Sequence, residues 1–308
     1  MRICSTARRR RLHDRVAAPR RFGAIALSVA RLPRADTLSP RNFTRLAQYV
    51  YDTVGIKLPD AKKTMVEGRL RRRLQTLGID TLDAYCEYLF TGDRLVAESP
   101  LLINAVTTNK TDFFREPGHF DFIIETAIPA LLAQGTRSLR VWSAACSTGA
   151  EPYTLAMVLD DYAARNGGPD YGILATDLDT EVLATARAGI YPAELIDPVP
   201  AALRQKYVMA SKDPARREVR IVPRLRSAIG FARMNLMDDR YPVGDPMHLI
   251  FCRNVLIYFD KPTQKKVVSQ LYDCLAPGGY LLLGHSESIT GLGLPLQQVA
   301  NTVFRRGN

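Results

Sequence analysis

The sequence predicts an α/β domain with a largely parallel sheet, preceded by a small all-helical domain. From about residue 104 to residue 308, segments of strand and helix pattern alternate, which is typical of a parallel sheet covered on both faces. Residues 39–103 instead carry apolar side chains at helical spacing. A chain of 308 residues is long enough for both domains.

The helical domain is predicted from its start and stop signals. Ser39 and Pro40 offer an N-cap and a first-turn proline, after which apolar residues recur at helical spacing. A second helix is expected over 61–77, and a third from the Thr81 cap to about Gly92.

The second expected helix is strongly basic. Within twelve residues it carries one acidic residue, Glu67, against six basic ones. A solvated helix face explains such charge, and so does a docking surface for an acidic helical partner, because patches of one sign select partners by charge. The candidate docking residues are Lys62, Lys63, Arg69, Arg71, Arg72 and Arg73.

The spacing of apolar residues and the positions of turn residues divide the α/β part into expected strands and helices. Its expected strands are 138–145, 171–176, 228–234, 248–252 and 280–284. Its expected helices begin near Glu151 and span 180–188 and 262–275. A small antiparallel insertion is expected at about 204–231, where a strand pattern over 219–222 follows another near 206–209.

The residues after each expected strand are the candidate binding site, because ligands of open α/β sheets bind beyond the carboxyl ends of the strands. The loop 143–149 is made of small residues that let a ligand approach, although its single glycine is a weak nucleotide fingerprint. Asp177 either accepts hydrogen bonds from ribose hydroxyls or caps the next helix. Glu151, at a helix start, either complements the helix dipole or contacts a cofactor.

Two further pairs of candidate residues follow later strands. Asn235 and Leu236 come after the third strand, and Arg253 and Asn254 after the fourth. The apolar run behind Arg253 buries this pair, so its polar groups must find partners.

Bulk properties narrow the function further. The net charge is +11, but ten arginines lie within the first 40 residues, so the basicity says little about what the folded part binds. Residues 1–38 are interpreted as a basic disordered extension, or as an extension created by a start codon assigned too far upstream. An export signal is a third interpretation. Neither the five cysteines nor the four histidines have metal-ligand spacing, so no metal site is expected. No apolar run is long enough to span a bilayer.

Five segments in order resemble the CheR-type chemotaxis receptor glutamate methyltransferases. They are TTNKTDFFRE (107–116), WSAACSTGAEPY (142–153), ATDLDTEVL (175–183), FCRNVLIYFDK (251–261) and LAPGGYLLLGHSES (275–288). The resemblance runs from about Ser39 to Phe304 and implies a Rossmann-like methyltransferase domain with a small inserted β-subdomain behind an all-helical domain.

By the same resemblance, S-adenosylmethionine is the cofactor and the cytoplasmic helices of methyl-accepting chemoreceptors are the partner, in the cytoplasm. The implied catalytic residue is Tyr258, near the transferred methyl group. The implied cofactor contacts are Asn109, Thr111, Arg115, Glu151, Asp177, Asn235, Leu236, Arg253 and Asn254. A methyltransferase acting on RNA or a small molecule, and a non-catalytic cofactor- or receptor-binding module, stay open as alternatives.

Overall fold

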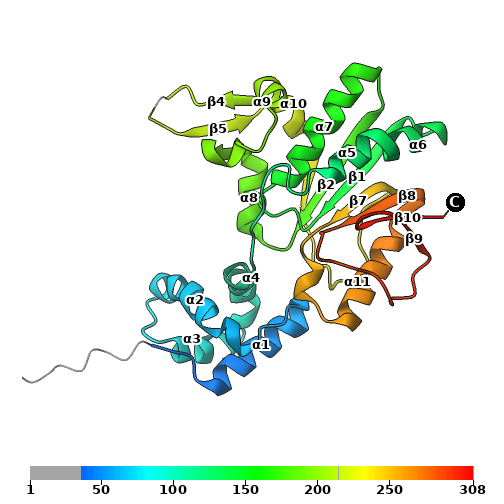
Figure 1. The fold of residues 1–308 in the computed structure, drawn as a ribbon. Coiled ribbons are helices and arrows are strands. Elements are labelled where there is room, and N and C mark those ends of the chain that lie inside the picture. The colour runs from blue at the N-terminus through cyan, green and yellow to red at the C-terminus, as the bar shows by residue number, and fades with distance from the viewer. Residues whose placement is uncertain (1–35, 214, 308) are drawn as a thin grey trace, which may run out of the picture. The chain divides into compact units, whose positions relative to one another are not determined.

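A computed structural model describes residues 36–213 and 215–307, so the predicted extension 1–38 lies almost entirely outside the described residues. The helical part contains α1 (Pro40–Val54), α2 (Lys63–Leu77), α3 (Leu82–Leu89) and α4 (Arg94–Val106), with a 3₁₀ turn over Asp60–Lys62 (Figure 1). The first three helices were predicted and α4 was not. The predicted caps are confirmed, because the side chains of Ser39 and Thr81 accept hydrogen bonds from Asn42 N and Ala84 N.

The α/β part is built on a seven-stranded sheet of order β6-β2-β1-β7-β8-β10-β9. The first five strands of that order run parallel, and β10 and β9 add an antiparallel hairpin that was not predicted. The strands are β1 (Ser138–Ala144), β2 (Asp170–Asp177), β6 (Ile229–Arg233), β7 (Met247–Cys252), β8 (Leu275–Leu283), β9 (Leu296–Ala300) and β10 (Val303–Arg306). The predicted strand 280–284 is the second half of β8.

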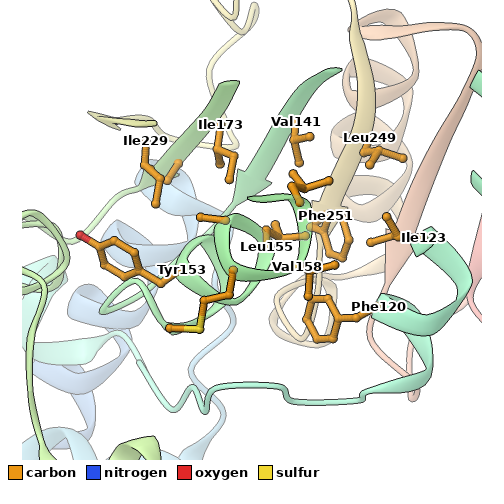
Figure 2. Close-up of a cluster of buried hydrophobic side chains, with 14 of the residues drawn as sticks. Phe120, Ile123, Val141, Tyr153, Leu155, Val158, Ile173, Ile229, Leu249 and Phe251 are labelled. Atoms are coloured by element: carbon orange, nitrogen blue, oxygen red, sulfur yellow. The ribbon is translucent and has the colours of Figure 1, made fainter. Parts of the chain in front are cut away.

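Helices cover both faces of the sheet. Neighbouring residues of β1 illustrate this, since Val141 belongs to one core cluster and Trp142 to another, as strand alternation requires. Figure 2 shows the first cluster, in which Leu155 and Val158 pack beneath the strands beside Phe120. The helices are α5 (Gly118–Phe122), a π turn (Ile123–Ala127), α6 (Ile128–Ala133), α7 (Ala150–Asn166), α8 (Thr180–Ala188) and α11 (Lys261–Asp273).

The insertion is a three-stranded antiparallel sheet of order β3-β5-β4 with two short helices. Its elements are β3 (Ile190–Pro192), α9 (Ala201–Tyr207), β4 (Val208–Ala210), β5 (Glu218–Ile221) and α10 (Pro223–Ser227). Asp160 of α7 anchors it, accepting from Tyr207 Oη at 2.7 Å and pairing with Arg224 at 2.7 Å. Within the described residues, none of the helices combines the length and apolar content needed to cross a bilayer.

The six predicted docking cations, of which Lys62 ends the 3₁₀ turn and five lie on α2, do not form one solvated face. Arg73 pairs with the buried Glu98 through two hydrogen bonds of 2.8 and 2.9 Å. Arg69 donates to the carbonyl oxygens of Val106 and Thr107, at the end of α4. These two arginines therefore hold α2 against α4.

Two of the remaining cations also lie beside other side chains. Lys63 Nζ lies 3.9 Å from Glu67, and Lys62 Nζ lies 5.0 Å from the ring centroid of Tyr258. Arg71 and Arg72 are exposed. The docking hypothesis stays a prediction, and these two exposed residues are the ones that can be changed without disturbing the contacts of Arg69 and Arg73.

We expect Arg73→Ala to destabilise the protein by about 3 kcal/mol, because it leaves the Glu98 carboxylate buried without its ionic partner. Arg72→Ala, one residue away and exposed, is the matched control and should change stability by less than about 0.5 kcal/mol. Denaturant titration followed by circular dichroism measures both variants. Equal midpoints for the two would contradict a structural role for Arg73.

Candidate functional site

One pocket lies at the carboxyl ends of β1, β2, β6 and β7, and its far side is formed by the helical part. Residues from α1 and the turn before α2 that line it are Val54, Ile56, Leu58 and Lys62. All ten predicted site residues line this same pocket: Asn109, Thr111, Arg115, Glu151, Asp177, Asn235, Leu236, Arg253, Asn254 and Tyr258. The structure therefore brings together residues that are up to 149 positions apart in sequence (109 to 258).

The loop after β1 forms the floor of the pocket by adopting left-handed backbone conformations. Ala145, Ser147 and Gly149 have φ values of 62°, 51° and 93°. At Gly149 a Cβ atom would lie 2.9 Å from the Tyr191 hydroxyl and from Ala186 Cβ, so the single glycine of the loop is required by close packing. The Ser147 amide donates to Asp177 at 2.8 Å, which ties the loop to the end of β2.

Asp177 is not the cap of the following helix. Asp179 caps α8 by accepting from the amides of Glu181 and Val182 at 2.8 and 3.2 Å. Asp177 accepts from Ser147 N and Asp179 N and lies in the pocket wall. Burial raises the pKa of its carboxyl group, against the opposing effect of these backbone donors.

The segment between the helical part and β1 closes another side of the pocket. Asn109 Nδ2 donates to Asp179 at 2.7 Å, and the Asn109 carbonyl accepts from Ser147 Oγ at 2.8 Å. Arg115, which also lines the pocket, donates from Nη1 to the Lys110 carbonyl at 3.1 Å. The linker is thus attached to the ends of both β1 and β2.

Arg253 is the most buried cation of the pocket, with a side chain only 2% exposed. Its guanidinium donates to Glu116 at 2.9 and 3.2 Å, to Glu151 at 3.3 Å and to the Arg115 carbonyl. Burial raises the pKa of Glu151, and the charge of Arg253 only partly offsets it. Glu151 also accepts from Ser143 Oγ at 2.7 Å.

Two glutamates outside the predicted set of site residues support this arrangement. Glu116 accepts from Arg253 and, through its other oxygen, from Asn254 Nδ2 at 3.3 Å and His285 N at 3.2 Å. Desolvation raises the pKa of Glu116, but Arg253 and these donors outweigh it, and the net pKa lies below the usual value. Both glutamates stand within segments quoted above, Glu116 after FFR and Glu287 in GHSES, yet neither directly follows a strand.

Glu287 fixes the turn that presents Asn254. It accepts from the amides of Gly284, Asn254 and Ile257 at 2.6, 2.9 and 3.3 Å. Asn254 has a φ of 58°, and a Cβ atom at Gly284 would lie 2.4 Å from its side-chain nitrogen. A carboxylate therefore holds the backbone in a conformation that non-glycine residues seldom adopt.

The last predicted residues lie on the side of the pocket that meets the helical part. Asn235 donates from Nδ2 to the Thr53 carbonyl at 2.8 Å and accepts from Met237 N at 3.0 Å. Tyr258 is half-buried, and its carbonyl oxygen accepts from Lys57 N at 3.2 Å. Its ring lies beneath the Lys62 ammonium group. Leu236 is buried in the pocket wall and adds an apolar surface there.

The pocket fits a nucleoside that carries an amino-acid group. Asp177 offers carboxylate oxygens where a ribose would meet the end of β2. The buried carboxylate of Glu151, with its raised pKa, suits a cationic group, and Arg115 suits a carboxylate. Leu236, Val255 and Phe259 add apolar surface for a base.

Comparison with known proteins agrees with this arrangement. Residues 109–304 match the family described as CheR methyltransferase, SAM binding domain, and residues 41–107 match the CheR methyltransferase all-alpha domain. The chain is 40% identical to a chemotaxis protein methyltransferase of Escherichia coli, covering 87% of this chain and 91% of that protein. It is 39% identical to that of Salmonella typhimurium (87% and 90%) and 38% identical to chemotaxis protein methyltransferase 2 of Pseudomonas aeruginosa (85% and 92%).

These matches cover both the helical part and the α/β part, and the pocket lies within the matched residues. The predicted fold, a Rossmann-like methyltransferase domain behind an all-helical domain, is confirmed, as is S-adenosylmethionine as the cofactor. The chain belongs to the CheR family of S-adenosylmethionine-dependent methyltransferases.

Proposed function

We propose that this protein transfers a methyl group from S-adenosylmethionine to glutamate side chains on the cytoplasmic helices of chemoreceptors, in the cytoplasm. The observation that carries the proposal is the gathering of ten polar and apolar residues from five separate segments around one pocket. The products are glutamate methyl esters and S-adenosylhomocysteine.

The reaction needs positioning more than acid–base chemistry. A glutamate side chain has a pKa of about 4.3, so at neutral pH its carboxylate is already the nucleophile and no general base is required. When bound, S-adenosylmethionine supplies an electrophilic methyl group on a sulfonium. The protein must then hold the acceptor oxygen in line with that methyl group and exclude water.

The charges of the pocket are arranged so that the acceptor carboxylate can be positioned without losing its reactivity. Arg253 is bound by two carboxylates, so its charge is compensated and it does not hold the acceptor carboxylate in an unreactive ion pair. Lys62 and Tyr258 line the pocket where it meets the helical part. We assign Tyr258 the role of fixing the approach of the acceptor, with Lys62 attracting its charge.

The first test measures the reaction itself with Tyr258→Phe. Isolated receptor cytoplasmic domains are incubated with labelled S-adenosylmethionine, and base-labile methyl ester is counted. Wild type should label the receptor, and Tyr258→Phe should lower turnover at saturating cofactor by about tenfold or more, since misplacing the reactants costs at least that much. Tyr272→Phe, whose ring packs under Arg306 away from the pocket, is the control.

An absence of base-labile label with wild type would reject glutamate as the acceptor. Label on RNA instead of the receptor would favour the rival substrate, and cofactor binding without any transfer would favour a non-catalytic module. Unchanged turnover in Tyr258→Phe would remove only the hydroxyl from the mechanism.

The second test concerns Asp177. Asp177→Asn removes the charge of the acceptor expected to bind the ribose, so S-adenosylhomocysteine should bind about tenfold more weakly in calorimetry. Because the pKa of Asp177 is raised, wild-type affinity should fall as the pH drops through that pKa and the carboxylate is protonated. The part of this pH dependence that comes from protonation of Asp177 should be missing in Asp177→Asn.

Asp170→Asn is the matched control, because Asp170 lies at the exposed opposite end of the same strand and should leave affinity unaltered. Melting without ligand distinguishes lost binding from lost folding, since Asp177 also holds the Ser147 amide. Native affinity in a folded Asp177→Asn protein would end the assignment.

The third test concerns docking. Reversing Arg71 and Arg72 to Glu should raise the KM for receptor severalfold, with an effect that shrinks at high salt, and leave cofactor affinity intact. The matched control reverses Arg137 and Arg165, exposed residues before β1 and near the end of α7. If both double variants methylate receptor equally well, α2 is a solvated face and not a docking surface.

A further inference from the structure

Three side chains beside the pocket converge in a way that the cofactor does not explain. Glu116 Oε2 lies 3.6 Å from His119 Nδ1 and 4.0 Å from His285 Nε2, and the three atoms lie within 4.8 Å of one another. The two imidazole rings meet edge to face with centroids 5.3 Å apart. The cluster joins the linker before β1 to the turn after β8.

His119 faces this cluster with an unsatisfied nitrogen. The residue is 3% exposed, and its Nδ1 has no hydrogen-bond partner among the described residues. Its Nε2 lies 3.0 Å from Thr302 Oγ1, and that hydroxyl donates its own hydrogen to the Asn301 carbonyl at 2.8 Å. With the hydroxyl hydrogen directed at that carbonyl, the hydroxyl oxygen accepts from His119 Nε2, and we assign His119 the tautomer whose Nδ1 lone pair faces Glu116.

Arg253 binds Glu116 Oε2, but the His119 Nδ1 lone pair that faces this oxygen at 3.6 Å has no donor or cation of its own. We propose that Glu116, His119 and His285 form a binding site for a divalent transition metal ion such as Zn²⁺. Two imidazoles and a carboxylate with one position left open are a donor set typical of such ions. Tetrahedral ligands at zinc are about 3.4 Å apart. The three donor atoms lie within 4.8 Å of one another, so the half-exposed His285 side chain must move inward to complete the site.

The surroundings supply the other features of a metal site. The Thr302 hydroxyl fixes the orientation and tautomer of His119, as second-layer groups do for metal-ligating histidines. The His285 side chain is 52% exposed, which gives an ion a path from solvent. His285 lies 169 residues after Glu116 and 166 after His119, which explains why sequence spacing gave no sign of the site.

The site shares Glu116 with Arg253, so it is coupled to the cofactor pocket. A divalent ion at Glu116 Oε2 competes with the guanidinium that donates to the same oxygen at 2.9 Å. Arg253 and Asn254 both line the cofactor pocket. Metal and cofactor should therefore oppose each other, and this coupling is reciprocal.

The experiment titrates untagged full-length protein with Zn²⁺ in competition with a chromogenic chelator. Wild type should bind one ion per chain. His285→Ala should weaken binding by about tenfold or more, while the backbone amide of residue 285 continues to donate to Glu116. Because His285 is half-exposed, this variant is expected to fold, and circular dichroism verifies it.

Two further variants separate a built site from adventitious binding. Thr302→Val keeps the shape of the side chain, removes the acceptor for His119 Nε2 and should also weaken binding by about tenfold. His248→Gln removes a histidine outside the cluster, whose Nδ1 accepts from Arg140 N, and should bind Zn²⁺ as wild type does. With Co²⁺ as probe, the absorption spectrum should lack the charge-transfer band of thiolate ligation.

No Zn²⁺ binding by wild type, or equal affinity in wild type, His285→Ala and Thr302→Val, would overturn the site. Saturating S-adenosylhomocysteine should weaken Zn²⁺ binding severalfold in wild type, and an unchanged affinity would overturn the coupling. None of these measurements uses methyl transfer, so the outcome is separate from that of the proposed function.

Discussion

The buried guanidinium of Arg253 is the interaction on which the pocket depends. It joins β7 to the linker through Glu116 and to the start of α7 through Glu151, residues 137 and 102 positions away in sequence. Taking a charge out of water costs several kcal/mol unless its partners are well placed, and removing one partner of such a pair is strongly destabilising. The pocket therefore forms only when these three segments are assembled together.

Helix caps and buried strands could be predicted from the sequence because each is determined by residues that are close together in the chain. The caps at Ser39 and Thr81 could be predicted because a short polar side chain before an apolar periodic run has few other roles. The parallel strands could be predicted because they are apolar on both faces. Once the strands were placed, topology alone predicted that polar residues at their carboxyl ends would lie around one pocket.

The features that could not be predicted from the sequence depend on contacts between residues that are far apart in the chain or on hydrogen bonds that only the structure shows. A count of charges cannot tell Arg73, which is paired with Glu98, from Arg72, which is exposed. Asp177 and Asp179 both precede α8, and only the hydrogen bonds show that Asp179 is the cap. Glu116 and Glu287 follow no strand, so the rule that located the other residues could not find them. The hairpin of β9 and β10 was missed because it packs at the sheet edge behind a long loop.

The carboxylates of the pocket also explain why a cationic cofactor suits it. Burial raises the pKa values of Glu151 and Asp177, which means that each ionised form is less stable in the folded protein than in water. Glu116 and Glu151 share one guanidinium, so the anionic charge around Arg253 is not fully balanced. A ligand bearing sulfonium and ammonium charges would favour the ionised forms and lower both pKa values. The electrostatic cost of assembling the empty pocket is thus recovered when a positively charged nucleoside is bound, which selects that ligand over a neutral one.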